Sequence, residues 1–151
     1  MHPATMSWCA MLTENRSYPP FRGLFSLEGK KGLVLGIAND HSIAWGCAKL
    51  ARVMGADIVA TCMNDKARSY VEPLTKPLGI DLVNCNVEDT GALESLVAHT
   101  IDKLGSLDFV IHSIAWAPLQ DLHGRVVDSS STGFARAMEV SCHSFATLAK
   151  L

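Results

Sequence analysis

The sequence predicts an α/β fold of the Rossmann type, in which a parallel sheet in the order 3-2-1-4 carries helices on both faces. Short apolar runs alternate along the chain with segments of helical period, as expected for parallel strands joined by right-handed helical crossovers. The first such unit, KGLVLGIANDHSIAWG at residues 31–46, contains a strand, a glycine turn and a helix start in succession. This succession is typical of the first unit of a Rossmann sheet.

The length and composition are those of one globular domain. The chain has 151 residues, of which 48% are hydrophobic, and a formal net charge of −2. This charge gives no support for binding to nucleic acid or to an anionic membrane surface, and no apolar run is long enough to span a bilayer. We expect residues 1–25 to be a poorly ordered extension and residues 26–151 to belong to a single domain.

The cysteines and histidines do not indicate a metal site. The five cysteines are odd in number, and neither they nor the six histidines show the spacing of metal ligands. We expect buried thiols, which are typical of a reducing compartment. The sequence therefore predicts a cytoplasmic protein without a metal.

The hydrophobic periodicity predicts strands at residues 32–37, 57–62, 80–85 and 107–111. Helices are expected at residues 42–54, 66–78 and 90–104, followed by a loop at 121–128 and a final helix that runs to residue 151. The helix at 66–78 contains Pro73 and Pro77, so we expect a kink or an early stop near Glu72. The expected apolar face of the first helix is Ile43, Cys47, Leu50 and Met54. That of the last helix comprises Phe134, Met138, Cys142, Phe145 and Leu148.

Ligands of such sheets bind at the carboxyl ends of the strands, near the switch between strands one and four. Gly36 would permit the tight turn after the first strand. The unpaired amides of the helix start at Ser42 suit a pyrophosphate, although a simple N-cap role explains Ser42 equally well on this stretch alone. After the third strand, an adenine ring would rest against Asn86 and Val87, unless Val87 is only the last buried strand residue.

The turn after the second strand bears on the choice of dinucleotide. An acidic residue there binds the adenosine ribose, and a basic residue accommodates the extra phosphate of NADPH. Met63 is neither, which favours NADH, whereas Lys66 leaves NADPH open. Asp65 is more simply explained as the N-cap of the next helix.

Three stretches of the chain share their motifs with one known family. They are Gly36 with Ser42-Ile43-Ala44, the turn Asn64-Asp65-Lys66, and the run His112-Ser113-Ile114-Ala115-Trp116-Ala117-Pro118. Together they resemble the enoyl-acyl-carrier-protein reductases of bacterial type II fatty acid synthesis, divergent members of the short-chain dehydrogenase superfamily. Most of that superfamily uses a Thr-Gly-x3-Gly-x-Gly turn instead. The resemblance covers about residues 25–151 and implies that residues 26–151 are the N-terminal part of a single dinucleotide-binding Rossmann domain.

The resemblance implies a role for each matching position. The implied cofactor is NADH, the implied partner is an enoyl-acyl-carrier-protein substrate, and the parent enzyme is expected to be a homotetramer. Many relatives carry Gln at the position of Met63 and Asp at that of Asn86, so this chain lacks two of their polar contacts. The implied cofactor-binding residues are Gly36, Ser42 and Ile43 at the pyrophosphate, Met63 at the adenosine ribose, Asn86 and Val87 at the adenine, and Ile114 at the nicotinamide ribose. Ala117 would border the acyl substrate.

Relatives reduce a trans-2-enoyl thioester with the help of a Tyr and a downstream Lys. The only tyrosines here are Tyr18 and Tyr70, and Tyr70 lies in the helix after the second strand, where we expect a half-buried structural residue. We therefore assign no catalytic residue. The sequence ends where relatives continue with a fifth strand, so we expect a fragment, truncated before the second half of the sheet, that does not reduce enoyl thioesters alone. The resemblance also implies that the apolar face of the last helix is uncovered.

Two alternatives stay open. The first is another short-chain dehydrogenase, but Ile114 followed by Ala115 argues against it, because those proteins usually carry Asn-Ala-Gly after the fourth strand. The second is a non-catalytic dinucleotide-binding fragment, which the missing Tyr and Lys favour.

Overall fold

The computed structural model describes residues 26–151, so the expectation for residues 1–25 lies outside them. A parallel four-stranded sheet in the order β3-β2-β1-β4 confirms the predicted topology. Its register places Leu35 of β1 beside His112 of β4, so these two strands end at the same level. The strands are β1 (Lys31–Leu35), β2 (Asp57–Cys62), β3 (Asp81–Asn84) and β4 (Phe109–His112).

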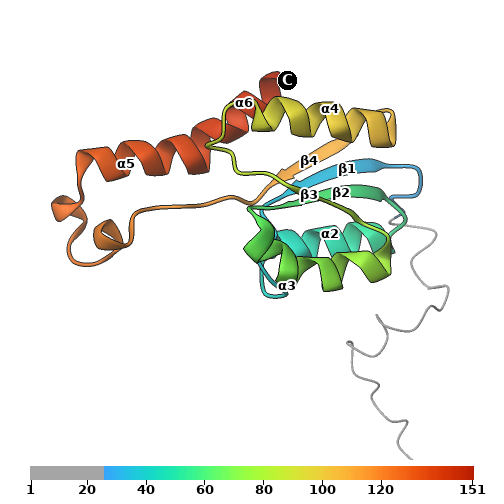
Figure 1. Ribbon diagram of the computed structural model, residues 1–151, viewed down its shortest axis with the longest axis horizontal. Helices are drawn as coiled ribbons and strands as arrows, with labels where there is room; N and C mark the ends of the chain where they lie inside the picture. Colours follow the sequence, from blue (N-terminus) through green and yellow to red (C-terminus); the bar gives the residue numbers. More distant parts are fainter. Residues whose placement is uncertain (1–25) are drawn as a thin grey trace, which may run out of the picture.

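Helices cover both faces of the sheet, as predicted (Figure 1). α2 (Ile43–Val53) and α3 (Asp65–Thr75) lie on one face, and α4 (Ala92–Leu104) and α6 (Ser144–Lys150) lie on the other. Alternate residues of β1 are buried in two separate cores, Val34 on the α2 side and Leu35 on the α4 side. Within residues 26–151, no helix is both long enough and apolar enough to cross a membrane.

The apolar face predicted for α2 is wrong. Ile43 is 77% exposed and Leu50 is 60% exposed. The buried residues of this helix are Ala44, Trp45, Ala48 and Ala51. Alanine side chains allow a helix to lie close to a sheet, so a stripe of small residues is packed inside while the larger aliphatic residues remain outside.

α3 continues through Pro73 and ends at Thr75, beyond the kink or early stop predicted near Glu72. Proline in a helix removes the hydrogen bond of its own amide, and here the rest of the last turn is retained. The Thr75 hydroxyl lies 3.3 Å from two carbonyl oxygens of the preceding turn. Pro77 follows in the 3-10 helix η1 (Lys76–Leu78), at a position where a proline amide is not needed.

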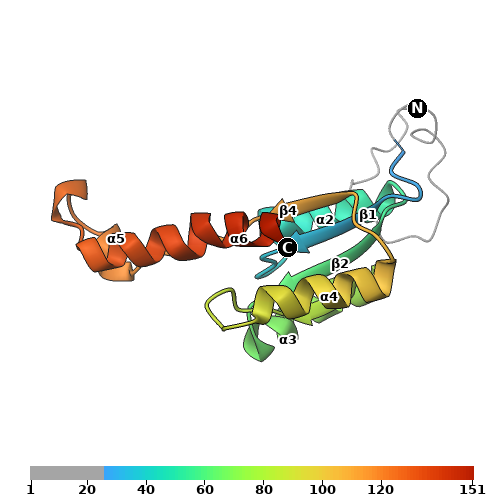
Figure 2. The ribbon, with the colours of Figure 1, turned by 90° about the horizontal axis from the view of Figure 1, so that it is seen from above.

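The C-terminal segment is a helical arm that projects beyond the sheet (Figure 1; Figure 2). It comprises α5 (Ser131–Met138), a π-helical turn (Glu139–His143) and α6. The π turn shifts the helical phase, so that Val140 and Ser144 are buried together with Leu148. Of the predicted apolar face, Leu148 is therefore covered, contrary to expectation. The remaining members are exposed, as predicted: Phe134, Met138, Cys142 and Phe145.

The other boundaries lie within two residues of those predicted. The segment predicted as a loop at residues 121–128 contains the end of one 3-10 helix, η2 (Leu119–Leu122), and all of another, η3 (Val126–Asp128). Short helices of this kind are common in connections, where they satisfy backbone groups without a long regular element. This connection leads the chain from the end of β4 out to the start of α5.

Replacing Pro73 by Ala is expected to stabilise the protein. The side chain is exposed, and the substitution restores an amide donor within α3. We expect the free energy of unfolding to rise by about 1–2 kcal/mol, measured by chemical denaturation followed by circular dichroism. Pro77→Ala is the matched control and should change stability by less than about 0.5 kcal/mol. A lower stability for Pro73→Ala would contradict this account of α3.

Candidate functional site

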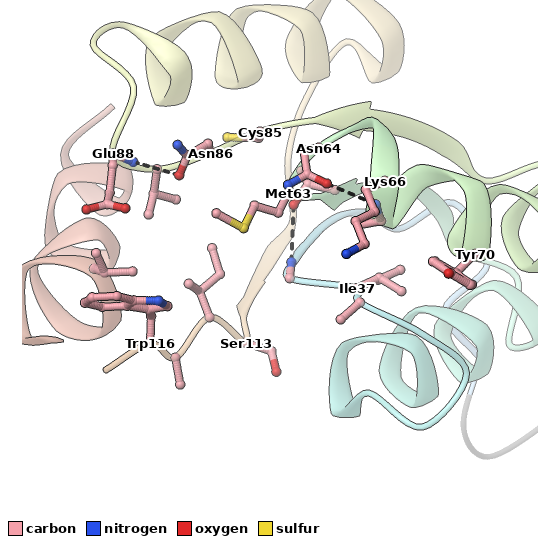
Figure 3. Close-up of a pocket in the computed structure, with 18 residues that line it drawn as sticks. Ile37, Met63, Asn64, Lys66, Tyr70, Cys85, Asn86, Glu88, Ser113 and Trp116 are labelled. Atoms are coloured by element: carbon pink, nitrogen blue, oxygen red, sulfur yellow. Dashed lines mark hydrogen bonds between the residues drawn. The ribbon is translucent and has the colours of Figure 1, made fainter. Parts of the chain in front are cut away.

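The carboxyl ends of the strands surround a cavity of about 380 Å³ (Figure 3). Its walls come from the segments that follow all four strands, and Val140 of the π turn completes one side. The strands β1 and β4 are neighbours in the sheet although β2 and β3 lie between them in sequence. The cavity therefore lies at the switch point of the sheet, where open α/β folds bind their ligands.

Gly36 has no room for a side chain. Its φ of +97° lies in the left-handed region, and a Cβ there would collide with the carbonyl of Ser113. The Gly36 amide donates to the Thr61 hydroxyl at 3.2 Å, and the Ile37 amide donates to the Thr61 carbonyl at 2.9 Å. On the other side, the Ser113 amide donates to the Leu35 carbonyl at 3.1 Å. The turn after β1 is thus fixed against both neighbouring strands.

The start of α2 has no side-chain cap. Ser42 occupies the N-cap position, but its hydroxyl donates to the Asn39 carbonyl instead of accepting from the helix. The predicted N-cap role of Ser42 is therefore correct for its position in the chain, but its hydroxyl does not bond to an amide of the helix. Uncapped amides and the helix dipole make this start suited to an anionic group. Ser42 and Ile43 themselves lie outside the cavity lining, a few residues beyond Gly36.

The turn after β2 presents Met63 and Lys66 to the cavity (Figure 3). Asn64 caps α3 by accepting a first-turn amide at 3.0 Å, so the prediction that Asp65 is the N-cap is wrong. The Asp65 carboxylate instead accepts from the Asn84 side chain at 2.6 Å, and Asp65 is not part of the lining. At this turn the cavity wall carries a cation and no carboxylate.

The turn after β3 is held by its own polar groups. The Asn86 side-chain amide donates to Asp89 at 2.9 Å, and its oxygen accepts from the Glu88 amide at 3.3 Å. Val87 and Cys85 line the cavity beside it. Burial raises the pKa of the Cys85 thiol to about 11, so this side chain is a neutral part of the wall.

The segment after β4 is fastened to the C-terminal arm. The Ser144 hydroxyl donates to the Val140 carbonyl and accepts from Nε2 of His112 at 2.8 Å. Burial lowers the pKa of His112, which favours the neutral imidazole in this place. The Trp116 amide donates to the Ser141 hydroxyl at 2.9 Å, and that hydroxyl donates to the Trp116 carbonyl at 3.1 Å. The arm thereby positions the cavity-lining residues that follow β4.

The cavity brings together most of the residues predicted to bind a cofactor: Gly36, Met63, Asn86, Val87 and Ile114. Ala117 lines neither this cavity nor the neighbouring one of about 430 Å³, but it lies between Trp116 and Pro118, which both line the second. Tyr70 was expected to be half buried. It is 63% exposed and belongs to the lining.

Sequence reasoning missed two residues at this site. Thr61 is the one polar residue in the buried part of β2, and its hydroxyl is the one signal in the sequence of a special role. Arg136 contacts Glu88, which lies 48 positions away in sequence, so no local spacing could indicate the pair. Residues 26–151 contain no cluster of three or more His, Cys, Asp or Glu side chains that could hold a metal ion.

The fold and the cavity together define a Rossmann-type α/β protein with a cavity at the switch point of its sheet. A family model described as enoyl-(acyl carrier protein) reductase matches residues 36–151. This match covers more than half of the chain and includes every segment that lines the cavity. The chain belongs to the enoyl-(acyl carrier protein) reductase family.

Individual relatives agree with the family match. An enoyl-acyl-carrier-protein reductase (NADH) of Rhizobium meliloti is 39% identical over 124 residues, which are 82% of this chain and 46% of the relative. The solved structure of the reductase of Anaplasma phagocytophilum in complex with NAD has 38% identity and a TM-score of 0.77, covering 82% of this chain and 48% of that one. The Bacillus cereus reductase with NADP+ and an indole naphthyridinone has 31% identity and a TM-score of 0.77, covering 82% and 49%. The chain spans about half the length of the relatives it matches.

Gly36→Ala is expected to damage the turn after β1. A Cβ at φ +97° is strained and meets the Ser113 carbonyl, so we expect a loss of about 2–3 kcal/mol in the free energy of unfolding. Gly46→Ala is the matched control, since Gly46 lies within α2 with open space around its Cα, and it should stabilise by about 0.5–1 kcal/mol. Denaturant titrations of both variants give the comparison. An unchanged stability of Gly36→Ala would contradict the close approach.

Proposed function

We propose that the chain forms the dinucleotide-binding part of an NADH-dependent enoyl-acyl-carrier-protein reductase, which reduces trans-2-enoyl thioesters in fatty acid biosynthesis. The observation that supports this most directly is the turn at Gly36. Gly36 follows β1 at the switch point of the sheet, and no side chain covers its backbone. The chain then leads to the start of α2, which has no side-chain cap. Phosphate groups bind where backbone amides can be approached in this way. Family membership supports the class of reaction.

The cavity residues fit the parts of a dinucleotide. The turn from Gly36 to Ser42 and Ile43 would hold the pyrophosphate and the nearby ribose. Val87 would flank the adenine, and Ile114 would lie beside the nicotinamide ribose. Apolar walls with a few fixed polar groups are typical of sites for such ligands. The bound reduced nicotinamide would supply the hydride for the enoyl group.

At the adenosine end, the lack of a basic side chain at Met63 favours NADH, whereas Lys66 leaves NADPH open. Met63 offers the ribose no hydrogen bond, and the amide of Asn86 is already bonded to Asp89 and Glu88. A carboxylate that would repel an extra phosphate is missing from the lining at this turn, where Lys66 is present instead. The relatives named above include reductases solved with NAD and with NADP+.

The acyl-carrier-protein substrate would enter on the side of Ala117, which follows Trp116, a residue that lines both cavities. We also propose the cytoplasmic location and the homotetramer of the whole protein that the family implies. The exposed Phe134, Met138 and Phe145 on the arm support a role of this surface in assembly.

A non-catalytic dinucleotide-binding role is the second candidate. It is favoured by the position of Tyr70, which is the one tyrosine among residues 26–151 and lies on α3. Tyr70 lines the cavity near Lys66, at the adenosine end. The enoyl group to be reduced would lie at the other end, near the segment after β4. We therefore assign no proton donor to this chain.

The chain of 151 residues is expected to bind NADH saturably, observed as a change in nucleotide fluorescence upon titration. A parallel titration with NADPH should give weaker binding, because Met63 is not the basic residue that would accommodate the additional phosphate. The binding should still be measurable, because Lys66 can face that phosphate. Incubation with a trans-2-enoyl thioester and NADH should give no oxidation of the nucleotide by this chain. A folded chain that binds neither nucleotide would contradict the proposed function. Oxidation of NADH would instead rule out the non-catalytic candidate.

A further inference from the structure

One end of the cavity is formed by an acidic and an aromatic side chain. Figure 3 shows the Glu88 carboxylate and the Trp116 indole near one another at this end, and both residues line the cavity. Glu88 follows β3, whereas Trp116 follows β4. A carboxylate at the wall of a site for a pyrophosphate is unfavourable unless its charge is compensated.

Arg136 of α5 compensates this charge with favourable geometry. Its Nε and Nη2 donate to the two oxygens of Glu88 at 2.7 and 3.0 Å, which is a bidentate pair. The same guanidinium lies 4.2 Å from the centre of the Trp116 ring, in a cation–π contact. The pKa of Glu88 is lowered chiefly by the hydrogen bonds from Arg136, so the carboxylate stays ionised at neutral pH. One side chain of the arm therefore holds both residues at this end of the cavity.

Trp116 also separates two spaces. Trp116 lines both the cavity at the carboxyl ends of the strands and the second cavity. Arg136, on α5, lines the second cavity only. The backbone of Trp116 is fixed by Ser141, as described above, so its indole is the part left to be oriented. The stacked guanidinium of Arg136 orients it.

We propose that Arg136 is a positioning residue for the dinucleotide: it neutralises Glu88 at the cavity wall and holds the Trp116 indole in place. This inference rests on the proposed function, because it requires an anionic ligand in the cavity. It assigns to the arm an electrostatic role in cofactor affinity that is separate from its role in packing. If the role were only structural, removal of either partner of the pair would weaken binding. An electrostatic role instead predicts effects of opposite sign for the two partners.

The test measures the dissociation constant of NADH by fluorescence for the full chain and three variants. Arg136→Gln leaves Glu88 uncompensated and should weaken NADH binding about fivefold at low salt, with a smaller effect at about 0.5 M salt. Glu88→Gln leaves a free cation and should tighten binding about twofold. The double variant removes both charges and should return to within about twofold of the parent chain.

The matched control is Arg125→Gln, which breaks a bidentate pair of similar geometry with Asp128 at 2.8 and 2.9 Å. Arg125 lines neither cavity, so its loss should leave NADH affinity unchanged. Weaker binding by Glu88→Gln, or a double variant as weak as Arg136→Gln, would overturn the electrostatic role. If Arg136→Gln fails to fold, the Glu88→Gln variant still decides between the two roles, because an electrostatic role predicts tighter NADH binding for it and a structural role predicts weaker binding. A parent chain that binds no NADH overturns the proposed function and this inference together, whereas normal parent binding with unaffected variants overturns this inference alone.

Discussion

The site depends on the close approach of two neighbouring strands at their carboxyl ends. Gly36 and the carbonyl of Ser113 leave no space for a Cβ, and the left-handed φ of Gly36 would cost any other residue about 1–2 kcal/mol. Hydrogen bonds tie the turn to Thr61 of β2 on one side and to Ser113, after β4, on the other. A turn that the protein's own hydrogen bonds hold in place loses little conformational entropy when it binds a ligand.

The other turns are fixed in the same manner, by hydrogen bonds between groups of the protein itself. Asn64 caps α3, Asn86 bonds within its own turn, and Ser141 holds the backbone of Trp116. These bonds are made within the protein, so the lining can consist largely of apolar groups such as Val87 and Ile114. The arm takes part in this arrangement because its π turn directs Val140 and Ser144 toward the sheet.

The sequence was sufficient for the strand order and for the turns that meet at the cavity. Alternation of apolar runs and the glycine before a helix start are local signals, and the topology follows from them. Helical period favours the larger apolar residues as the buried face of α2, whereas close packing on the sheet selects a stripe of alanines with Trp45. Pro73 predicts an early end of α3, but one missing hydrogen bond does not end this helix. The contact of Arg136 with Glu88 depends on the position of the arm and has no local pattern in the sequence.

The most direct test of the central claim is a crystal structure of the chain grown with NADH. The account predicts density for the pyrophosphate beside the backbone of Gly36 and Ile37 and the start of α2, with the adenine near Val87 and the nicotinamide ribose near Ile114. Such density would show that the close approach of β1 and β4 forms the binding site. The account would be contradicted if well-ordered NADH bound elsewhere on the molecule and not in the cavity at the strand ends.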